Sequence, residues 1–404
     1  MSRPPLLSLD EARARLVEGV AALPAETVSL DEALDRVLAA PVTAHRDQPP
    51  VPMSAMDGYA VRDADMPGAL NGVPWQVIGE APAGVPYAGS VGAGEAVRIF
   101  TGAVVPDGAD RVIVQEVMTR EGDEARLTGE VGGAAHVRPA GLDFAGGQPV
   151  LTAGTALGPA QLALAAAANA GAVPVHRRPR VAVVSSGDEL VDPGGAPGPA
   201  QVIDAAGHGV AACVRRWGGA VTGRRRLPDT PSACAAAARE LTADADVVVT
   251  IGGASVGDRD LLRAAFAEAG ADEVFAGVAV RPGKPFWHAR TPRGEGTCLM
   301  VGLPGNPASA LVTARLLLAP LIGVLTGLGT EAFTRTKRLP LAEGAPSPGR
   351  RETWARGRRD GGVARIDPRD DSALLTPLAM ADCLVRQPKG EALAAGSSVD
   401  VLPW

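Results

Sequence analysis

Two loops in the second half of the chain carry residues suited to binding an oxyanion. One is the stretch RPGKPF from Arg281 to Phe286, and the other is GLPGNPASA from Gly302 to Ala310. The second loop follows an apolar run typical of a buried strand, and Asn306-Pro307 is typical of a helix N-cap followed by a first-turn proline. Backbone N–H groups at a helix N-terminus attract anions, and Arg281 and Lys284 add full positive charge. The pattern indicates a site for phosphate or another oxyanion.

Acidic and glycine-rich loops follow other predicted strands of the same region. Asp188 and Glu189 follow one strand, Asp229 follows a second, and the motif GGASVGD from Gly252 to Asp258 follows a third. Because ligands bind outside the carboxyl ends of strands in open α/β sheets, we expect these loops at one edge. Each residue alone has an ordinary explanation as a turn or cap, so it is their convergence that favours a function. Carboxylates beside basic residues suit a divalent cation bridging phosphate oxygens, which predicts Mg²⁺.

The elements that would position these loops alternate between strand and helix from Arg180 to about Gly327, as in a βαβ domain with a mostly parallel sheet. Capping boxes at Ser8 and Ser29 predict N-terminal helices ending near residues 22 and 39. Short β-like runs separated by Gly and Pro predict an inserted β-rich domain and a C-terminal β-barrel-like domain. The expected domains are an N-terminal helical and extended linker domain (1–54 plus 131–178), a β-rich insertion (55–130), an α/β domain (179–329) and a C-terminal β domain (330–404).

Composition fits a soluble, multi-domain protein and argues against several other classes. The 404 residues are 46% hydrophobic and 21% charged, and a net charge of −6 disfavours a nucleic-acid partner. The four cysteines form no C-x-x-C motif and the five histidines no metal-ligand spacing, so we expect reduced thiols in a cytoplasmic protein without a zinc site. The uncharged stretch 144–175 is broken by Gly and Pro, which predicts a linker strand and a buried helix instead of a membrane span.

Two further groups of residues have both a structural and a functional interpretation. Asp57 and Thr101 stand at predicted turns of the β-rich insertion, where turn residues are the default explanation. An arginine run begins at Arg350, directly after Gly349. Such runs are usually solvated, yet a guanidinium placed there could clamp an oxyanion through two hydrogen bonds.

Six motifs together carry a resemblance to a known family. They are, in chain order, SAMDGYAVR, RIFTGAVVPDGADRVIVQE, SSGDEL, GGASVGD, RPGKPF and GLPGNPASA. In this order they resemble the molybdopterin molybdenumtransferase (MoeA) family, whose animal counterpart is the E domain of gephyrin, over essentially the whole chain. The resemblance implies molybdenum cofactor biosynthesis. Molybdenum from molybdate would enter adenylylated molybdopterin in the α/β domain, with Mg²⁺-dependent cleavage and release of AMP.

The resemblance also implies roles for individual residues. Mg²⁺ would be held by Asp229, Asp258 and Glu189. The catalytic group would comprise Asp57, Thr101, Asp143, Glu189, Asp229, Asp258 and Lys284. Substrate would be bound by Gly252, Gly253, Ser255, Arg281, Pro285, Pro304, Gly305, Asn306, Pro307, Ser309, Arg350 and Ser372. The resemblance leaves open whether Arg350 or Arg351 clamps the oxyanion.

The resemblance extends to assembly and partners. It implies a homodimer in which the β-rich domain of one subunit leans over the α/β site of the other, so that Asp57 and Thr101 act in trans. Molybdopterin adenylyltransferase and recipient molybdoenzymes would be transient partners, with no nucleic acid or membrane involved. Two alternatives remain at this point, namely an adenylyltransferase of similar α/β fold and a catalytically idle scaffold.

Overall fold

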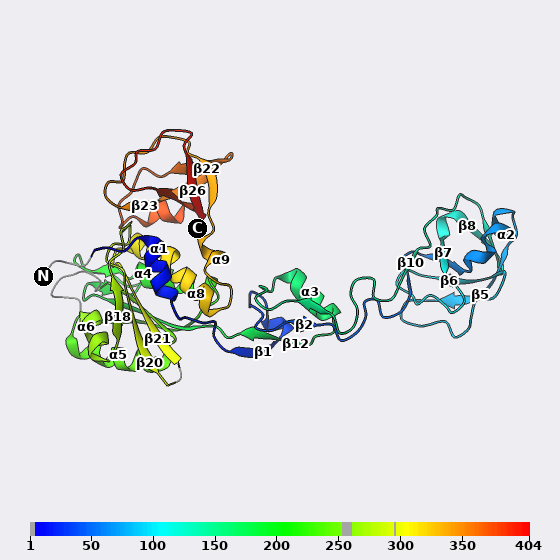
Figure 1. The fold of residues 1–404 in the computed structure, drawn as a ribbon, viewed down its shortest axis with the longest axis horizontal. Helices are drawn as coiled ribbons and strands as arrows, with labels where there is room; N and C mark the ends of the chain where they lie inside the picture. The colour runs from blue at the N-terminus through cyan, green and yellow to red at the C-terminus, as the bar shows by residue number, and fades with distance from the viewer. Residues whose placement is uncertain (1–4, 253–260, 295) are drawn as a thin grey trace.

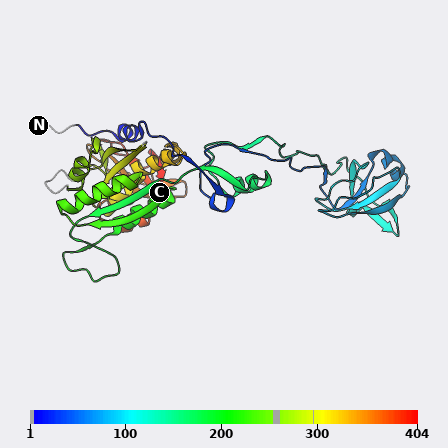
Figure 2. The ribbon, with the colours of Figure 1, turned by 90° about the horizontal axis from the view of Figure 1, so that it is seen from below.

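The computed structural model describes residues 5–252, 261–294 and 296–404. The molecule is elongated (Figures 1 and 2). An α/β body and a C-terminal β body lie together at one end, a small linker body lies in the middle, and a β-rich body lies at the other end. The chain passes through the linker body once on the way out to the β-rich body and once on the way back.

The α/β body is built on a six-stranded sheet in the order β16-β13-β17-β21-β20-β18. The first four strands are parallel, whereas β20 and β18 run antiparallel at one edge. The strands are β16 (Ala220–Leu227), β13 (Arg180–Ser186), β17 (Val247–Ile251), β21 (Gly296–Leu303), β20 (Trp287–Arg293) and β18 (Asp272–Ala276). The sheet is therefore mostly parallel, as predicted, but the sequence analysis missed β20.

Helices cover both faces of this sheet. Val181 and Val183 of β13 pack into a core with α4 (Ala205–Arg216), α7 (Pro307–Thr313) and α8 (Ala319–Leu325), whereas Ala182 and Val184 pack on the opposite side with α5 (Pro231–Asp244) and α6 (Leu261–Glu268). Successive residues of a strand point to opposite faces, which is why a run of apolar residues suits a strand covered on both sides.

A π-helical segment, Ala314–Leu318, joins α7 to α8, so that one helix runs from Pro307 to Leu325. Within the described part of the chain this helix alone is long and apolar enough to cross a membrane, with a mean hydropathy of 1.9. The fold buries 89% of its apolar stretch, as is usual for the core helix of a soluble protein. The stretch 144–175 instead forms β11 (Pro149–Leu151), α3 (Pro159–Ala167) and β12 (Ala172–His176).

Of the two predicted N-terminal capping boxes, the one at Ser8 begins an α-helix and the one at Ser29 does not. Ser8 caps α1 (Leu9–Val17) as predicted, although the helix ends before Gly19, which has a φ of +69°. The second predicted helix was wrong. Ser29 ends β1 (Ala25–Ser29), which pairs with β12, and a single 3-10 turn, Leu30–Glu32, follows. The Ser29 hydroxyl donates to the Glu32 carboxylate at 2.9 Å, but it caps no backbone N–H, because strand pairing already fixes this segment.

The β-rich body contains a six-stranded sheet in the order β7-β4-β6-β5-β9-β8. Its elements are β4 (Gly58–Val61), α2 (Met66–Leu70), β5 (Trp75–Ala81), β6 (Glu95–Ile99), β7 (Arg111–Val114), β8 (Met118–Glu121) and β9 (Glu124–Leu127). Two short antiparallel strand pairs lie along the two chain segments that lead to and from this body. They are β2 (Val42–Thr43) with β11, and β3 (Met53–Ser54) with β10 (Val137–Arg138). A further pair, β14 (Leu190–Val191) with β15 (Val202–Ile203), extends from the α/β body.

The C-terminal body is a sheet in the order β19-β23-β25-β26-β22, with β24 paired to β23. Its elements are α9 (Glu331–Thr334), β22 (Lys337–Pro340), β23 (Glu352–Asp360), β24 (Val363–Ile366), α10 (Leu375–Ala379), β25 (Cys383–Gln387) and β26 (Ser398–Pro403). One edge strand, β19 (Val280–Arg281), comes from the α/β body, so the two bodies share a sheet.

Candidate active site

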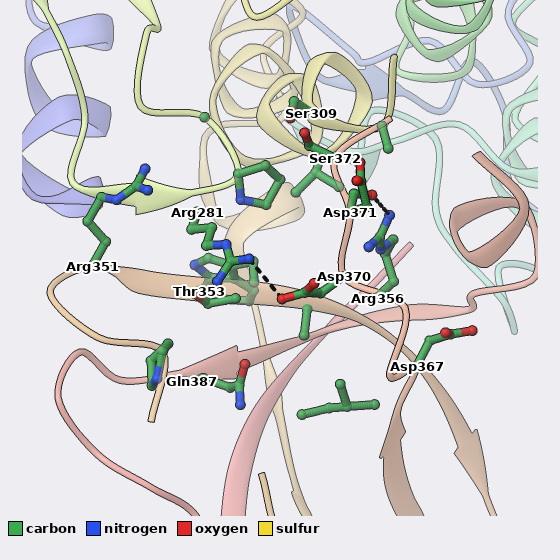
Figure 3. A pocket seen from close by; sticks show the side chains of 18 of the residues that line it. Arg281, Ser309, Arg351, Thr353, Arg356, Asp367, Asp370, Asp371, Ser372 and Gln387 are labelled. Carbon is green, nitrogen blue, oxygen red and sulfur yellow. Dashed lines mark hydrogen bonds and ion pairs between the residues drawn. The ribbon is translucent and has the colours of Figure 1, made fainter. Parts of the chain in front are cut away.

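A cavity of about 590 Å³ lies between the α/β body and the C-terminal body (Figure 3). Both loops singled out in the sequence line it. The α/β side contributes Arg281, Pro282, Gly283, Lys284, Pro285, Pro304, Asn306, Ala308, Ser309 and Val312. The C-terminal body contributes the rest of the lining, including Arg351, Thr353, Arg356, Asp370, Ser372 and Gln387. Two separate stretches of the sequence, 281–312 and 345–387, therefore form one site.

Strand pairing fixes the RPGKPF loop against the C-terminal body. Val280 pairs with Glu352 and Arg281 with Thr353, in parallel register. The Arg351 guanidinium also donates to the carbonyl of Val280 at 3.2 Å. Gly283 has a φ of +125°, and a Cβ there would lie 2.7 Å from the Thr313 hydroxyl, so glycine is needed for the loop to pack on α7. Lys284 is exposed at the cavity.

Two side-chain contacts connect the α/β wall of the cavity to the wall formed by the C-terminal body. The Arg281 guanidinium pairs with Asp370 at 2.8 Å, and the Asn306 amide donates to the Ser372 hydroxyl, also at 2.8 Å. Asn306 is the N-cap residue of α7 as predicted, but its side chain contacts the C-terminal body instead of capping the helix. The segment 367–374 is thus attached to the α/β body at two points.

Buried Arg356 holds the same segment from the other side. Its guanidinium donates to the carbonyls of Asp371 at 2.9 Å, Leu374 at 3.0 Å and Arg369 at 2.5 Å. Burial lowers the pKa of Arg356, yet an arginine pKa starts so high that the side chain stays charged. The sequence analysis included Arg356 only in an arginine run. No sequence pattern marked it as the support of this loop.

The structure distinguishes the two candidate arginines. Arg351 lines the cavity, whereas Arg350 is exposed and does not belong to the lining. Arg350, expected among the substrate-binding residues, therefore lies outside this cavity, whereas Arg351 lies in its wall. The reason is local, because Arg351 directly precedes β23 and so follows the register of a strand that borders the cavity.

The acidic residues expected at one edge of the sheet, Asp188, Glu189 and Asp229, follow the carboxyl ends of β13 and β16. We call them the rim. The Ser186 hydroxyl donates to the Asp229 carboxylate, and the Asp229 backbone N–H donates to the Asp188 carboxylate at 3.0 Å. The Glu189 carboxylate lies close to Gly187, where a Cβ would come within 2.6 Å of it. Sequence reasoning did not assign a role to Ser186, which joins these loops.

Glycines bring the rim and the cavity together. Gly252 has a φ of +83°, and a Cβ there would lie 2.8 Å from the Ser186 carbonyl oxygen. A Cβ on Gly305 would lie 3.5 Å from the Gly252 Cα, so the turn between Pro304 and Asn306 borders the rim as well as the cavity. Pro307 follows as the first residue of α7. Gly253, Ser255 and Asp258 lie outside the described residues.

The rim residues fit Mg²⁺ in their chemistry, although they do not form a complete cage. Across residues 5–252, 261–294 and 296–404, no group of three or more His, Cys, Asp or Glu side chains could hold a metal ion. Mg²⁺ usually takes one or two carboxylates and completes its octahedron with substrate phosphates and water. Two neighbouring carboxylates are present, since Asp188 accepts from the Asp229 N–H and Asp229 accepts from the Ser186 hydroxyl, and they satisfy that smaller requirement.

Asp57 and Thr101 form a separate polar pair in the β-rich body. Asp57 directly precedes β4, and Thr101 follows β6. Two hydrogen bonds from Thr101, the larger effect coming from its backbone N–H, lower the pKa of Asp57. This body lies at the opposite end of the molecule from the cavity (Figures 1 and 2). Asp143 is exposed in the linker segment, where its N–H donates to the Gln48 carbonyl at 2.9 Å.

Three family models match consecutive parts of the chain. The MoeA N-terminal region (domain I and II) matches residues 7–169, a probable molybdopterin binding domain matches residues 182–323, and the MoeA C-terminal region (domain IV) matches residues 338–404. Together they cover the linker and β-rich bodies, the α/β body and the C-terminal body. The rim and the whole α/β wall of the cavity fall within the second match.

Named relatives and a solved structure agree with these matches. A molybdopterin molybdenumtransferase from Nostoc sp. is 37% identical over 331 residues, covering 81% of this chain and 76% of the relative. One from Synechococcus elongatus is 33% identical and covers 98% of this chain and 99% of the relative. A molybdopterin biosynthesis moeA protein from Pyrococcus horikosii, 30% identical, superposes with a TM-score of 0.82 over 99% of both chains. The chain belongs to the molybdopterin molybdenumtransferase (MoeA) family of molybdenum cofactor biosynthesis enzymes.

Proposed function

We propose that the enzyme inserts molybdenum from molybdate into adenylylated molybdopterin, with Mg²⁺-dependent cleavage of the adenylate and release of AMP. The single observation that carries this proposal is the cavity between the α/β and C-terminal bodies, which is lined by Lys284, Arg281 and Arg351. A tetrahedral dianion needs donors from several directions and full positive charge. A cavity built from two bodies supplies donors from both sides.

Molybdate would lie between Lys284, Ser309 and Arg351. Lys284 offers a compact ammonium group, and Ser309 lies in the first turn of the long helix that begins at Pro307, where free N–H groups favour an anion. Within the described parts of the chain, no carboxylate forms an ion pair with Lys284 or Arg351. Their charge is therefore available to an anionic substrate.

The pterin and the adenylate would occupy the neighbouring rim, where Gly252 and Gly305 allow close approach of a ligand to the backbone. Asp229, Glu189 and Asp258 would hold Mg²⁺ there. When bound, Mg²⁺ would neutralise charge on the phosphoanhydride. The turn at Pro304 to Asn306 borders both regions, so the pterin dithiolene could face the oxyanion while the adenylate remains at the rim.

Asp57 and Thr101 would act on the site of a second subunit, and Asp143 would also belong to the catalytic group. We propose a homodimer with shared sites, because the body that carries Asp57 and Thr101 lies at the end of the molecule opposite its own cavity. The hydrogen bonds from Thr101 lower the pKa of Asp57, so its carboxylate stays ionised further into the acid range than an ordinary aspartate. Molybdopterin adenylyltransferase and the recipient molybdoenzymes would be transient partners.

We also propose a cytoplasmic location for the enzyme. Its four cysteines are free thiols, and burial raises the pKa of Cys213 to about 11 and that of Cys298 to about 12. Such thiols stay protonated and unreactive. This is the expected state of structural cysteines in a reducing compartment.

AMP release from adenylylated molybdopterin, measured with and without molybdate, tests the reaction. We expect release to require both molybdate and Mg²⁺, and the pterin product to contain one molybdenum atom. Formation of the adenylate from ATP and molybdopterin would instead identify an adenylyltransferase. Binding of the adenylate without turnover under any metal or oxyanion condition would identify an idle scaffold.

A further inference from the structure

A buried hydroxyl group without a partner belongs to a residue of the cavity wall. Thr353 lies on β23 with only 9% of its surface exposed, and among the described residues its Oγ1 has no hydrogen-bond partner. Thr353 lines the cavity (Figure 3). Buried hydroxyl groups nearly always find a partner, and rotation about the Cα–Cβ bond would let the Thr353 hydroxyl meet one in the cavity that this side chain lines.

The sheet places polar groups on both sides of Thr353. Arg281 on β19 pairs with Thr353, and Thr353 pairs with Gln387 on β25. Registered partners on neighbouring strands point to the same face of a sheet, and all three residues line the cavity. A guanidinium, a hydroxyl and an amide thus form one row across three strands. We call Arg281, Thr353 and Gln387 the polar row.

The charge around the polar row favours an anion. The cavity is lined by four basic side chains, Arg281, Lys284, Arg351 and Arg356, and by three acidic ones, Asp367, Asp370 and Asp371. Asp370 pairs with Arg281, and Asp367 pairs with Arg369, which holds the pKa of Asp367 at about 2. The surplus charge is positive. A donor without a partner in such a cavity suits an oxyanion better than a cation.

We propose that the Thr353 hydroxyl is a further oxyanion-binding group, donating a hydrogen bond to an oxygen of molybdate on the wall opposite Ser309. This proposal rests on the proposed function, because it takes molybdate as the occupant of the cavity. The two hydroxyl groups differ in origin. Ser309 belongs to a helix of the α/β body, and Thr353 to a strand of the C-terminal body. The C-terminal body would then provide a neutral donor in addition to the charge of Arg351.

Isothermal titration calorimetry with sodium molybdate tests this role in four variants of the full-length protein. Thr353→Val keeps the shape and removes the hydroxyl, whereas Thr353→Ser keeps the hydroxyl. Thr250→Val is the matched control, since Thr250 is fully buried on β17, its hydroxyl also lacks a partner among the described residues, and it does not line the cavity. Lys284→Ala is the positive control for molybdate binding at this cavity.

A hydrogen bond to a charged group predicts a loss of affinity of roughly 10- to 100-fold in Thr353→Val. Thr353→Ser and Thr250→Val should bind molybdate within about 3-fold of the unmodified protein. AMP release by Thr353→Val should recover at saturating molybdate, which separates a binding role from misfolding.

Two results would overturn the assignment of Thr353. One is unchanged molybdate affinity in Thr353→Val while Lys284→Ala loses binding, in which case the hydroxyl contacts only water. The other is an equal loss in Thr353→Val and Thr353→Ser, which would make the effect one of packing. If neither the unmodified protein nor any variant binds molybdate, the proposed function itself fails, and this outcome is distinct from the other two.

Discussion

The carboxylate of Asp57 accepts two hydrogen bonds from Thr101, one from its backbone N–H at 2.7 Å and one from its hydroxyl at 2.8 Å. Both bonds stabilise the ionised carboxylate and lower its pKa. Any function of the ionised Asp57 is therefore present at neutral pH and is lost only as the pH falls through the lowered pKa. Both donors of Thr101 thus serve the same carboxylate.

Thr101→Val should raise the pKa of Asp57, because it removes the hydroxyl bond and leaves the backbone bond in place. NMR titration of the Asp57 carboxyl carbon would measure the change directly. The acid limb of the pH–activity profile should move to higher pH together with it. Thr101→Ser, which keeps a hydroxyl, should titrate like the unmodified protein. Identical titration curves in Thr101→Val and the unmodified protein would contradict the prediction.

Mixing two inactive variants tests whether the active sites are shared. Asp57→Ala changes the β-rich body, whereas Asp258→Asn changes the α/β loop. If each site uses both bodies from different subunits, a hybrid dimer contains one site built from two unmodified halves. We expect mixtures to recover part of the AMP-releasing activity. No recovery, with subunit exchange verified by native mass spectrometry, would place both residues in one chain's site.

Lys284→Ala and Arg351→Ala should both weaken molybdate binding, whereas Arg350→Ala should not. Removing a charged donor from a desolvated ion pair costs about 2–5 kcal/mol, and the exposure of Lys284 points to the lower part of that range. Arg350 does not line the cavity and is the matched control. Calorimetry with molybdate decides the matter. Equal losses in Arg350→Ala and Arg351→Ala would contradict the assignment of Arg351.

Neutralising Asp370 should strengthen molybdate binding. Asp370 pairs with Arg281 at 2.8 Å and brings negative charge to the wall of an anion cavity, so Asp370→Asn frees the guanidinium. Both partners are well exposed, and such pairs contribute about 0.2–1 kcal/mol. We expect a gain in affinity of about 2- to 5-fold, which shrinks as salt is added. Weaker binding would show that the pair positions Arg281 for the anion.

His288 should make the α/β body less stable in mild acid. Burial lowers its pKa from 6.5 to about 4, while its ring contacts the Met300 carbonyl at 2.9 Å and Arg290. The unfolded chain binds a proton more readily than the folded one, so stability falls as the pH drops from about 6.5 to 4. The shift corresponds to about 3 kcal/mol.

Amide exchange in β20 and β21, corrected for its intrinsic dependence on pH, would measure the effect of His288. We expect protection to fall between pH 6.5 and pH 4.5 in the unmodified protein. His288→Gln, which cannot titrate, should be less stable at pH 7 but nearly insensitive over this range. A similar slope in both proteins would assign the acid sensitivity to other groups.

The sequence predicted elements best where apolar runs and caps agree. The valine-rich run of β17, Val247–Ile251, and the capping box at Ser8 both formed as predicted. The box at Ser29 did not form a helix, because pairing of β1 with β12 overrides a local signal. Strand β20 was missed because its sequence, WHARTPR, contains two arginines and a proline and lacks the apolar run of the parallel strands. It is a strand because it pairs with β21 on one side and with β18 on the other.

For the site, the sequence located the loops of the α/β body and not their partners. Lys284 and Asn306 stand in Gly- and Pro-rich motifs that a reader can recognise. Thr353 and Gln387 have no such marker, since their role comes from the register of three strands. The choice between Arg350 and Arg351 likewise depends on where β23 begins, which the pattern of charges does not specify.

The pairing of β19 with β23 has a consequence for any attempt to separate the two bodies. The strand that ends at Arg281 has its hydrogen-bonding partner in the C-terminal body, and Lys284 follows three residues later. A protein truncated before Lys337 would therefore lose more than the side chains that line one wall. The peptide leading to Lys284 would have an unpaired edge, and the anion loop would have to order itself at the moment of binding. The C-terminal body thus contributes to the site in two ways. It forms one wall, and its strand β23 also holds the peptide that leads to Lys284 in the opposite wall.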